Sequence, residues 1–269
     1  MTSLPSTLTT ERSLSVFRRI AILIAVAILA AGAYLAYSFF RTPEEASAPI
    51  EALPVAVDQS AAESSAPAVN STPTAMPAGE ARQENDPAGA GPIIFEIVQE
   101  ESEARFLIDE VLRGSDNTVV GSTDQVAGQI AVYPEAPSRS QVGVIQVNAR
   151  TLATDNNFRN RALKNRILRT NEFEFITFTP TEIRNLPDVV AIGEPISFEI
   201  VGDLTVTDVT RPVVFEVTLT PVSRTRLEGM ARATVKHADF NLAIPDSPQV
   251  DTVADDVILE LSFVAVPAG

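Results

Sequence analysis

The chain contains no cysteine and no tryptophan, and its 269 residues include a single histidine, His237. The lack of cysteine excludes disulfides, lipid attachment to an N-terminal cysteine and the usual Cys/His zinc sites. A serine-histidine site would have to use His237, which ends a strand-like stretch and which we interpret as structural. Neither a Gly-x-Ser-x-Gly string nor a glycine-rich phosphate loop is present. We therefore predict no catalytic residue, no metal site and no cofactor.

Positive charge is also scarce. The chain has 20 Lys and Arg against 35 Asp and Glu, a formal net charge of −15. From residue 92 onward there are 26 acidic and 15 basic residues. Nucleic-acid-binding surfaces are basic, so we expect no nucleic-acid partner.

One long apolar run stands near the N-terminus, at residues 20–40, and it carries no charge over 21 residues. As a helix it would be about 31 Å long, close to the thickness of a bilayer core, and we predict a transmembrane anchor. Arg12, Arg18 and Arg19 precede it, which favours a cytoplasmic segment 1–19 and an extracytoplasmic C-terminal domain in a single-pass protein. A cleaved signal peptide is the alternative, but its apolar region would be shorter.

Residues 41–91 differ from both neighbours. From Thr42 to Gly91 there are seven prolines, 13 alanines, no aromatic residue, and eight acidic residues against one base, Arg82. Such a segment cannot bury enough apolar surface to offset the entropy cost of ordering. We predict a disordered linker, which would let the following domain move relative to the membrane.

Residues 92–269 read as one β domain. Roughly nine runs rich in Val, Ile, Thr and Phe alternate with period two between Gly, Pro, Asn and Asp. This pattern predicts an all-β antiparallel sandwich or closed barrel. Residues 154–168 break it: Phe158, Ala162, Leu163 and Ile167 fall at helical spacing after Thr154 or Asp155 as the cap, predicting one short helix between middle strands.

Four strings carry a family resemblance: residues 119–130, residues 151–163, residues 173–178 and, as the most specific, Gly202-Asp203-Leu204-Thr205 through Val209-Thr210-Arg211-Pro212-Val213. They resemble the YceI-like family of exported polyisoprenoid-binding proteins over most of residues 102–266. The resemblance implies a lipocalin-like antiparallel barrel. Three positions depart from the family strings: Asn160 replaces an aspartate, Glu174 a proline and Asp208 a glycine. Aspartate is tolerated in a left-handed turn position, so Asp208 is compatible with the hairpin.

Such a barrel can hold one apolar ligand, and the resemblance implies a polyisoprenoid or quinone-like lipid as the partner. We predict that the following residues line the cavity: Phe106, Phe158, Ile176, Phe178, Phe198, Leu204 and Phe215. The alternative for each is a place in a filled core.

The predicted helix carries a basic face in this acidic chain, made by Arg159, Arg161, Lys164 and Arg166. We predict that these residues bind an anionic headgroup or diphosphate, the alternative being a solvated helix face. The helix could lie over the barrel mouth or fill its side.

The leading hypothesis is a membrane-anchored, exported lipid-binding module without enzymatic activity, attached to the membrane through residues 20–40. One alternative is a ligand-free interaction domain with a filled core, and a homodimer is compatible with either. A third reading is an enzyme acting on a lipid-like substrate, in which Asp203, Asp208 or His237 would lie in the cavity with a shifted pKa.

Overall fold

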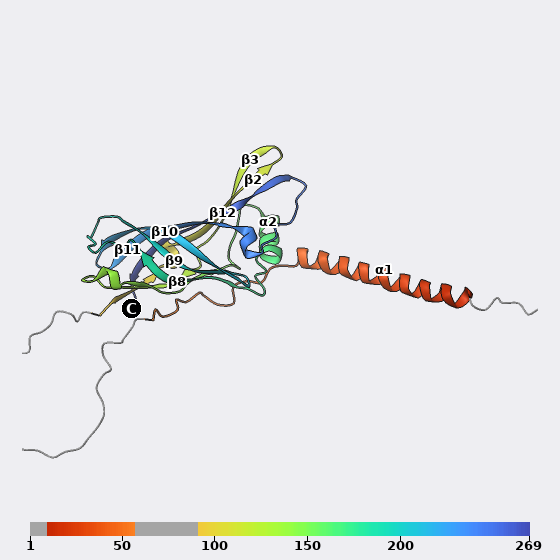
Figure 1. Cartoon of the computed structure of the whole chain (residues 1–269), viewed down its shortest axis with the longest axis horizontal. Helices are drawn as coiled ribbons and strands as arrows, with labels where there is room; N and C mark the ends of the chain where they lie inside the picture. The colour runs from red at the N-terminus through yellow and green to blue at the C-terminus, as the bar shows by residue number, and fades with distance from the viewer. Residues whose placement is uncertain (1–9, 57–90) are drawn as a thin grey trace, which may run out of the picture.

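The computed structural model describes residues 10–56 and 91–269. It consists of one curled antiparallel sheet and a long helix, α1 (Thr10–Phe40), that projects from one end of the sheet (Figure 1). Residues 1–9 of the predicted cytoplasmic segment and residues 57–90 of the predicted linker lie outside the described residues.

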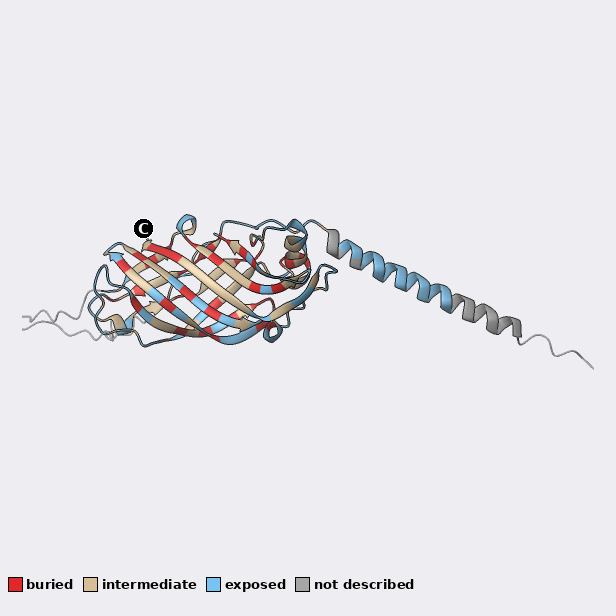
Figure 2. Cartoon of the chain, turned by 90° about the horizontal axis from the view of Figure 1, so that it is seen from above, coloured by how far each residue is buried: buried red, intermediate tan, exposed pale blue. Residues whose placement is uncertain are grey.

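The side chains described along α1 are exposed and apolar, as Leu23, Ile28 and Leu29 illustrate (Figure 2). Within the part of the chain that the structure describes, no helix reaches the length and hydropathy needed to cross a membrane. The predicted anchor at residues 20–40 therefore stays a prediction.

Twelve strands form the sheet, rather than the roughly nine runs expected. Their bounds are β1 Ile93–Ile97, β2 Glu103–Leu112, β3 Ser115–Thr123, β4 Val126–Ala127, β5 Gln129–Val132, β6 Gln141–Val142, β7 Ile145–Asn148, β8 Phe175–Arg184, β9 Ile196–Val206, β10 Val209–Ser223, β11 Arg226–Lys236 and β12 Val250–Pro267. Short 3₁₀ turns lie at Gln99–Glu101, Pro137–Arg139 and His237–Phe240. The difference in number arises largely because two expected runs are each interrupted, at Gly128 and at residues 143–144.

The sheet curls because both ends of its strand order belong to one stretch of chain. The order is β4-β7-β8-β9-β10-β11-β12-β1-β5-β6, with β2 and β3 added beside β12. Only Gly128 separates β4 from β5, and only two residues separate β6 from β7. The Gly128 carbonyl accepts from the Ile97 amide, and the Gly143 amide donates to Gln129. The all-β antiparallel fold with one short helix between middle strands is thus confirmed as a curled, barrel-like sheet.

Period-two alternation along the strands separates an inner face from an outer face (Figure 2). In β9, Ile196, Ile200 and Leu204 are buried while Asp203 is exposed. The largest buried cluster gathers such residues from β8 to β11 together with Leu163 and Leu168 from the helical segment. This inner face is the wall on which the site is built.

The helical segment comprises α2 (Asn157–Ala162) and one π-helical turn, η3 (Leu163–Ile167). Its cap is Asn156, whose side chain accepts from the amides of Phe158 and Arg159, so the predicted caps Thr154 and Asp155 were wrong. Thr154 is engaged elsewhere, since its amide and hydroxyl both donate to Asn160. The amide that replaces the family's aspartate at Asn160 therefore fixes the turn that leads into the helix.

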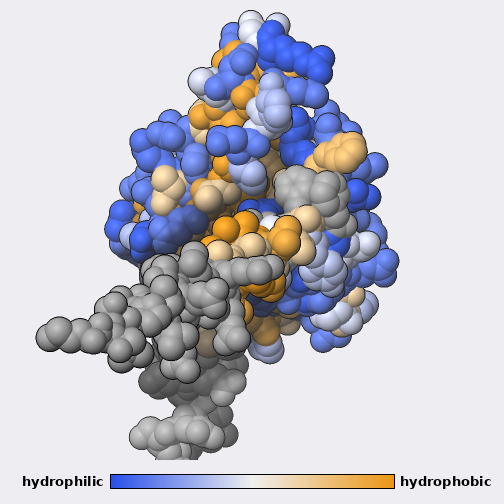
Figure 3. Space-filling view, turned by 90° about the vertical axis from the view of Figure 1, so that its right-hand side faces the viewer, coloured by the Kyte–Doolittle hydropathy of each residue, from blue (hydrophilic) through white to orange (hydrophobic). Residues whose placement is uncertain are grey.

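This segment packs against the end of the sheet from which α1 leaves. Leu163 and Leu168 are buried there, beside Leu152 and Phe240. Figure 3 looks onto this end, from which α1 projects, and shows mostly hydrophilic side chains with apolar ones gathered near the centre. Through the buried Leu163 and Leu168, the helical segment of α2 and η3 therefore fills one end of the curled sheet.

Residues 41–56 correct the prediction of a fully disordered linker. They run from the end of α1 along the sheet (Figure 1), and we call them the strap. Asn165 donates to the Arg41 carbonyl at one end, and the Val55 amide donates to Gln129 at the other. Between them Ile50 is 4% exposed and its carbonyl accepts from Gln99. The composition of residues 41–56 did not reveal these contacts, because the strap binds to a surface that only the folded sheet provides.

A buried ion cluster holds the strap at its middle. Glu174 accepts from the amide and hydroxyl of Ser47 at 2.8 and 2.7 Å, and Arg150 pairs with both Glu174 and Glu44 at 3.1 Å. The side chains of Arg150 and Glu174 are 11% and 12% exposed. Both are satisfied by further hydrogen bonds, as buried charges require. Glu174 is one of the departures from the family strings, and its role here is to bind the strap.

We predict that Glu174→Gln loosens the strap without unfolding the sheet. Hydrogen bonds to a charged acceptor contribute roughly 1.5–3 kcal/mol each. The substitution weakens the two that Ser47 of the strap donates to Glu174. Amide hydrogen exchange of residues 44–50 should therefore become faster by at least about tenfold. Glu172→Gln is the matched control, because Glu172 is 63% exposed and pairs only with Arg169. Equal exchange in the two variants would contradict the role of Glu174.

The same cluster predicts a pH dependence of the strap. Burial alone would raise the pKa of Glu174, but hydrogen bonds from Ser47 and Asn148 and the charge of Arg150 outweigh it and lower the pKa. A lowered carboxylate pKa contributes stability that is present above the unfolded value of about 4.3 and is lost as the pH falls through the folded pKa. Protection of the amides of residues 44–50, measured relative to their intrinsic exchange rates, should fall below about pH 4 in the parent chain more than in Glu174→Gln.

Candidate functional site

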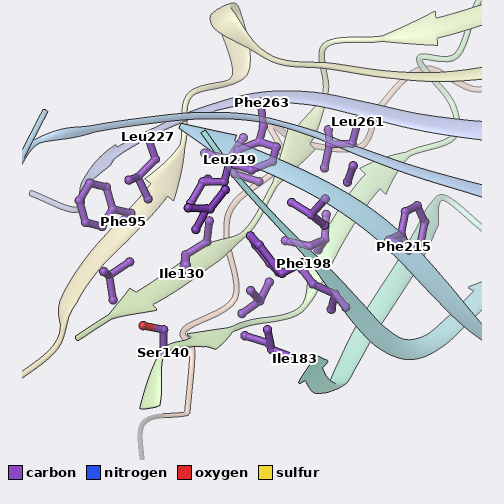
Figure 4. Close-up of a pocket in the computed structure, with 18 of the residues that line it drawn as sticks. Phe95, Ile130, Ser140, Ile183, Phe198, Phe215, Leu219, Leu227, Leu261 and Phe263 are labelled. Carbon is purple, nitrogen blue, oxygen red and sulfur yellow. The ribbon is translucent and has the colours of Figure 1, made fainter. Parts of the chain in front are cut away.

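The curled sheet encloses a cavity of about 620 Å³. Aliphatic and aromatic side chains from opposite strands converge on it, and Ser140 carries the one oxygen among the labelled residues in Figure 4. The volume lies within the range of small-molecule sites, roughly 300–1,000 Å³. The curled sheet is therefore hollow over part of its length. The apolar side chains that line this cavity suit an apolar ligand.

Six of the seven residues predicted to line a cavity do line it. They are Phe106, Ile176, Phe178, Phe198, Leu204 and Phe215. Phe178 and Phe215 meet edge to face, with ring centroids 4.8 Å apart, a preferred arrangement of aromatic pairs. The sequence identified these residues because each one stands at an inward position of a period-two strand. That they bind a ligand stays a prediction.

Gly202 makes room for one of these rings. A Cβ at this position would lie 2.6 Å from Cζ of Phe178 and 2.5 Å from the Thr179 carbonyl oxygen. Phe178 itself is only 8% exposed and lies in the largest buried cluster. The glycine of the most specific family string therefore lets the Phe178 ring pack against the backbone of the neighbouring strand.

The seventh residue, Phe158, does not line the cavity, so that prediction was wrong. Its side chain is 67% exposed, on the outer side of α2, and the Arg161 guanidinium lies 6.0 Å from its ring centroid. The helix buries Leu163 and Leu168 instead. Helical spacing gave an apolar stripe, but the change to a π-helical turn after Ala162 rotates the buried face away from Phe158.

The cavity opens at the end opposite to α2. Most of its lining is buried or half-buried, and the exposed members all lie at strand ends or loops on one side. These exposed members are Ile93, Pro134, Glu135, Ile192 and Arg224. We call this opening the mouth. The C-terminus, whose Ala268 amide donates to Ile94, lies at the same end, far from α1 (Figure 1).

The basic residues of the helix are therefore not at the mouth, so the first of the two placements expected for the helix, over the barrel mouth, was wrong. None of Arg159, Arg161, Lys164 and Arg166 lines the cavity. Arg159 pairs with Asp155 at 2.6 Å and with the buried Glu110 at 3.1 Å, and burial lowers the pKa of Lys164. The sequence could not place this face, because local pattern does not tell which end of a curled sheet a helix closes.

Polar groups around the cavity are few, and most have partners. Arg105 and Glu260 are paired at 2.8 Å, and Arg232 binds the other oxygen of Glu260 at 3.3 Å. At the mouth, the Tyr133 ring lies beneath the guanidinium of Arg139, 4.4 Å away. Among the charged residues of the cavity wall, Arg105 and Glu260 are thus paired, whereas Glu135 and Arg224 are exposed at the mouth.

The three residues named for an enzymatic reading lie elsewhere. Asp203 and His237 are not in the cavity lining, and the His237 ring is within hydrogen-bond distance of the Leu242 carbonyl at 3.0 Å. Asp208 stands in the two-residue turn between β9 and β10. A hydrogen bond from its own amide lowers the pKa of its carboxylate, and the Thr207 hydroxyl and the charge of Arg169 lower it further. The left-handed backbone of this turn falls on Thr207, at φ 55°, rather than on Asp208.

Sequence reasoning missed much of the lining near the mouth. These residues include Ile130, Ile183, Leu219, Leu227, Leu261 and Phe263 (Figure 4). Leu219, Leu261 and Phe263 stand at alternate positions of expected strands, so the periodic signal was present. Leu186, Val190 and Ile192 belong to a loop, where no periodicity marks an inward side chain.

These features define an all-β protein that encloses an apolar cavity open at one end. The sequence model of the YceI-like domain matches residues 95–265, more than half of the chain. The chain therefore belongs to the YceI-like family, as its strings indicated. No curated protein matches the chain.

Two solved structures share the fold. One is a polyisoprenoid binding domain from Saccharophagus degradans implicated in plant cell wall breakdown, with 13% identity and a TM-score of 0.52 over 65% of this chain and 98% of that one. The other is BcnA from Burkholderia cenocepacia, with 14% identity and a TM-score of 0.51 over 63% of this chain and 99% of that one. At such identities the similarity establishes the fold alone.

We predict that Gly202→Ala destabilises the protein by about 1–3 kcal/mol, because the added methyl group must displace Phe178 or the β8 backbone. Urea unfolding should show this loss in the free energy of unfolding, and the cavity should shrink as the ring moves inward. Gly91→Ala is the control, since a Cβ there meets nothing within 4 Å; its effect should stay within about 0.5 kcal/mol. Equal stability of both variants would show that the ring is free to move.

Proposed function

We propose that this protein binds the apolar chain of a lipid inside the curled sheet and holds it without chemical change. The observation that carries the proposal is the cavity of about 620 Å³, apolar along its walls, filled by a helix at one end and open at the other. Removal of apolar surface from water is the main driving force for such binding, about 0.8 kcal/mol per buried CH₂. Ten buried methylene equivalents would contribute about 8 kcal/mol before ordering costs.

The proposed ligand is a polyisoprenoid or quinone-like tail. A related fold is described as a polyisoprenoid binding domain, and this chain belongs to the same family by its sequence. A one-ended cavity suits a long chain that enters tail first and leaves its polar head at the mouth. Phe198, Phe215 and Leu219 would contact the chain, and Ser140, Ser223 and Arg224 at the mouth could contact the head.

We also propose that α1 anchors the domain to a membrane, with the sheet on the extracytoplasmic side. The support is the apolar run at residues 20–40, the arginines before it, and the exposed apolar side chains of α1. The extracytoplasmic location and a homodimer stay predictions.

The alternative of an interaction domain with a filled core is less well supported. It requires the inner residues to meet, whereas the inner face leaves a cavity between β1, β5, β9, β10 and β12. The enzymatic alternative requires Asp203, Asp208 or His237 in the cavity, and none of the three lines it. We therefore propose a carrier or sequestering role.

Mass spectrometry of an organic extract from the purified full chain tests the proposal. We expect a long-chain isoprenoid or quinone near one per protein. Leu219→Asp should reduce the lipid recovered by at least about tenfold, since a carboxylate in an apolar wall is strongly disfavoured. Val214→Asp is the matched control: it lies on the same strand, its side chain is 43% exposed, and it is not part of the cavity wall.

Thermal unfolding of both variants shows whether the sheet is intact. A folded parent chain without bound lipid, which also takes up none from added polyisoprenol, would overturn the proposal in favour of the interaction domain. Equal lipid recovery from Leu219→Asp and Val214→Asp would place the ligand outside this cavity.

A further inference from the structure

The loop at residues 186–195, between β8 and β9, exposes apolar side chains beside the mouth. Val189 is 82% exposed and Ile192 56% exposed, and Val189 is the most exposed of the large apolar residues described. Ile93 and Val222, at 37% and 43%, lie at the same end of the sheet. We call residues 186–195 the lip. Soluble proteins seldom gather exposed apolar groups around one opening unless something covers them.

The lip is continuous with the cavity. Leu186, Val190 and Ile192 are part of the cavity wall, whereas Val189 points away from it. One surface of the loop therefore contacts a bound chain, and the other faces the surroundings.

The lip has a defined conformation. The Gly193 amide donates to the Pro221 carbonyl at 2.7 Å, which ties the loop to the end of β10 next to Val222. Gly193 itself has φ 85°, a backbone region that other residues rarely adopt. The exposure of Val189 and Ile192 thus follows from a fixed turn.

Charge decides what kind of surface fits the lip. The ionisable residues of the loop are Asp188 and Glu194, both acidic and exposed, and the chain as a whole carries −15. These two carboxylates disfavour contact of the loop itself with an anionic surface. A ligand of the proposed class is confined to bilayers because of its insolubility, so its exchange needs an apolar contact with uncharged lipid.

We propose that the lip is a membrane-docking surface: Val189 and Ile192 insert into the interface of a neutral lipid bilayer and bring the mouth against it, so that an apolar chain can pass into the cavity. This inference rests on the proposed function and adds its partner. Burial of the two side chains contributes through apolar area rather than through charge, so docking should be insensitive to salt. The basic face of α2, at the opposite end, takes no part.

The absence of tryptophan from the chain permits a direct test. The full-length variant Val189→Trp is mixed with phosphatidylcholine vesicles whose acyl chains are brominated or not, since bromine quenches only a buried indole. We expect a blue shift and at least about twofold quenching, unchanged between about 0.1 and 1 M salt. Val214→Trp and Val120→Trp are the controls. Both positions are exposed, Val214 at 43% on β10 and Val120 at 42% on β3, and both lie away from the lip. They also account for any approach to the bilayer caused by α1.

Quenching at Val189→Trp no greater than at the two controls would overturn the docking surface. Quenching that disappears at high salt would overturn its apolar character. Lipid extraction from the same Val189→Trp protein separates this inference from the proposed function, since Val189 does not line the cavity. Bound isoprenoid without lip quenching refutes docking and leaves the cavity's function standing, whereas a lipid-free cavity refutes the proposed function itself.

Discussion

Curling of the antiparallel sheet, which brings both ends of its strand order into one stretch of chain, is the constraint on which the rest of this structure depends. That stretch runs from β4 to β7: it contains β4 and β6, the two ends of the order, and Gly128 lies between β4 and β5. A sheet curled in this way has an inner face whose side chains face one another, and they fill the centre only if they are large enough. Here they do not fill it: Phe178 packs against Gly202, and a cavity remains.

The two ends of the curled sheet are unlike, and this asymmetry gives the cavity its proposed use. Leu163 and Leu168 fill the end next to α1, whereas loops between β5 and β6, β8 and β9, and β10 and β11 surround the other. An apolar chain can therefore enter from one side only. With the strap in place, the mouth faces away from the point at which α1 leaves the domain. The lip and α1 thus lie at opposite ends of the molecule, so that, with the strap bound, the proposed docking of the lip requires a bilayer other than the one that would hold α1.

Positions at which this chain departs from its family strings have local explanations. Glu174 stands where the family usually has proline, and it binds Ser47 of the strap and pairs with Arg150. Asn160 stands where the family usually has aspartate, and it hydrogen-bonds Thr154 at the start of the helical segment. Glu174 thus adds a polar contact to the strap at a position where proline would offer none, whereas Asn160 provides a polar side chain at the start of the helical segment, as aspartate would.

The sequence by itself determined the all-β class, the short helix between middle strands and part of the inner face, because period-two alternation assigns each side chain to one side of a strand regardless of its partners. It also carried the family strings, and six of seven lining residues followed from inward positions such as Phe198 and Phe215. Only the tertiary structure decided which end opens, that Phe158 faces outward, and that residues 41–56 lie on the sheet. Each of these depends on surfaces made by residues far apart in the chain, as in the contact of Ser47 with Glu174, and no local pattern encodes such a meeting.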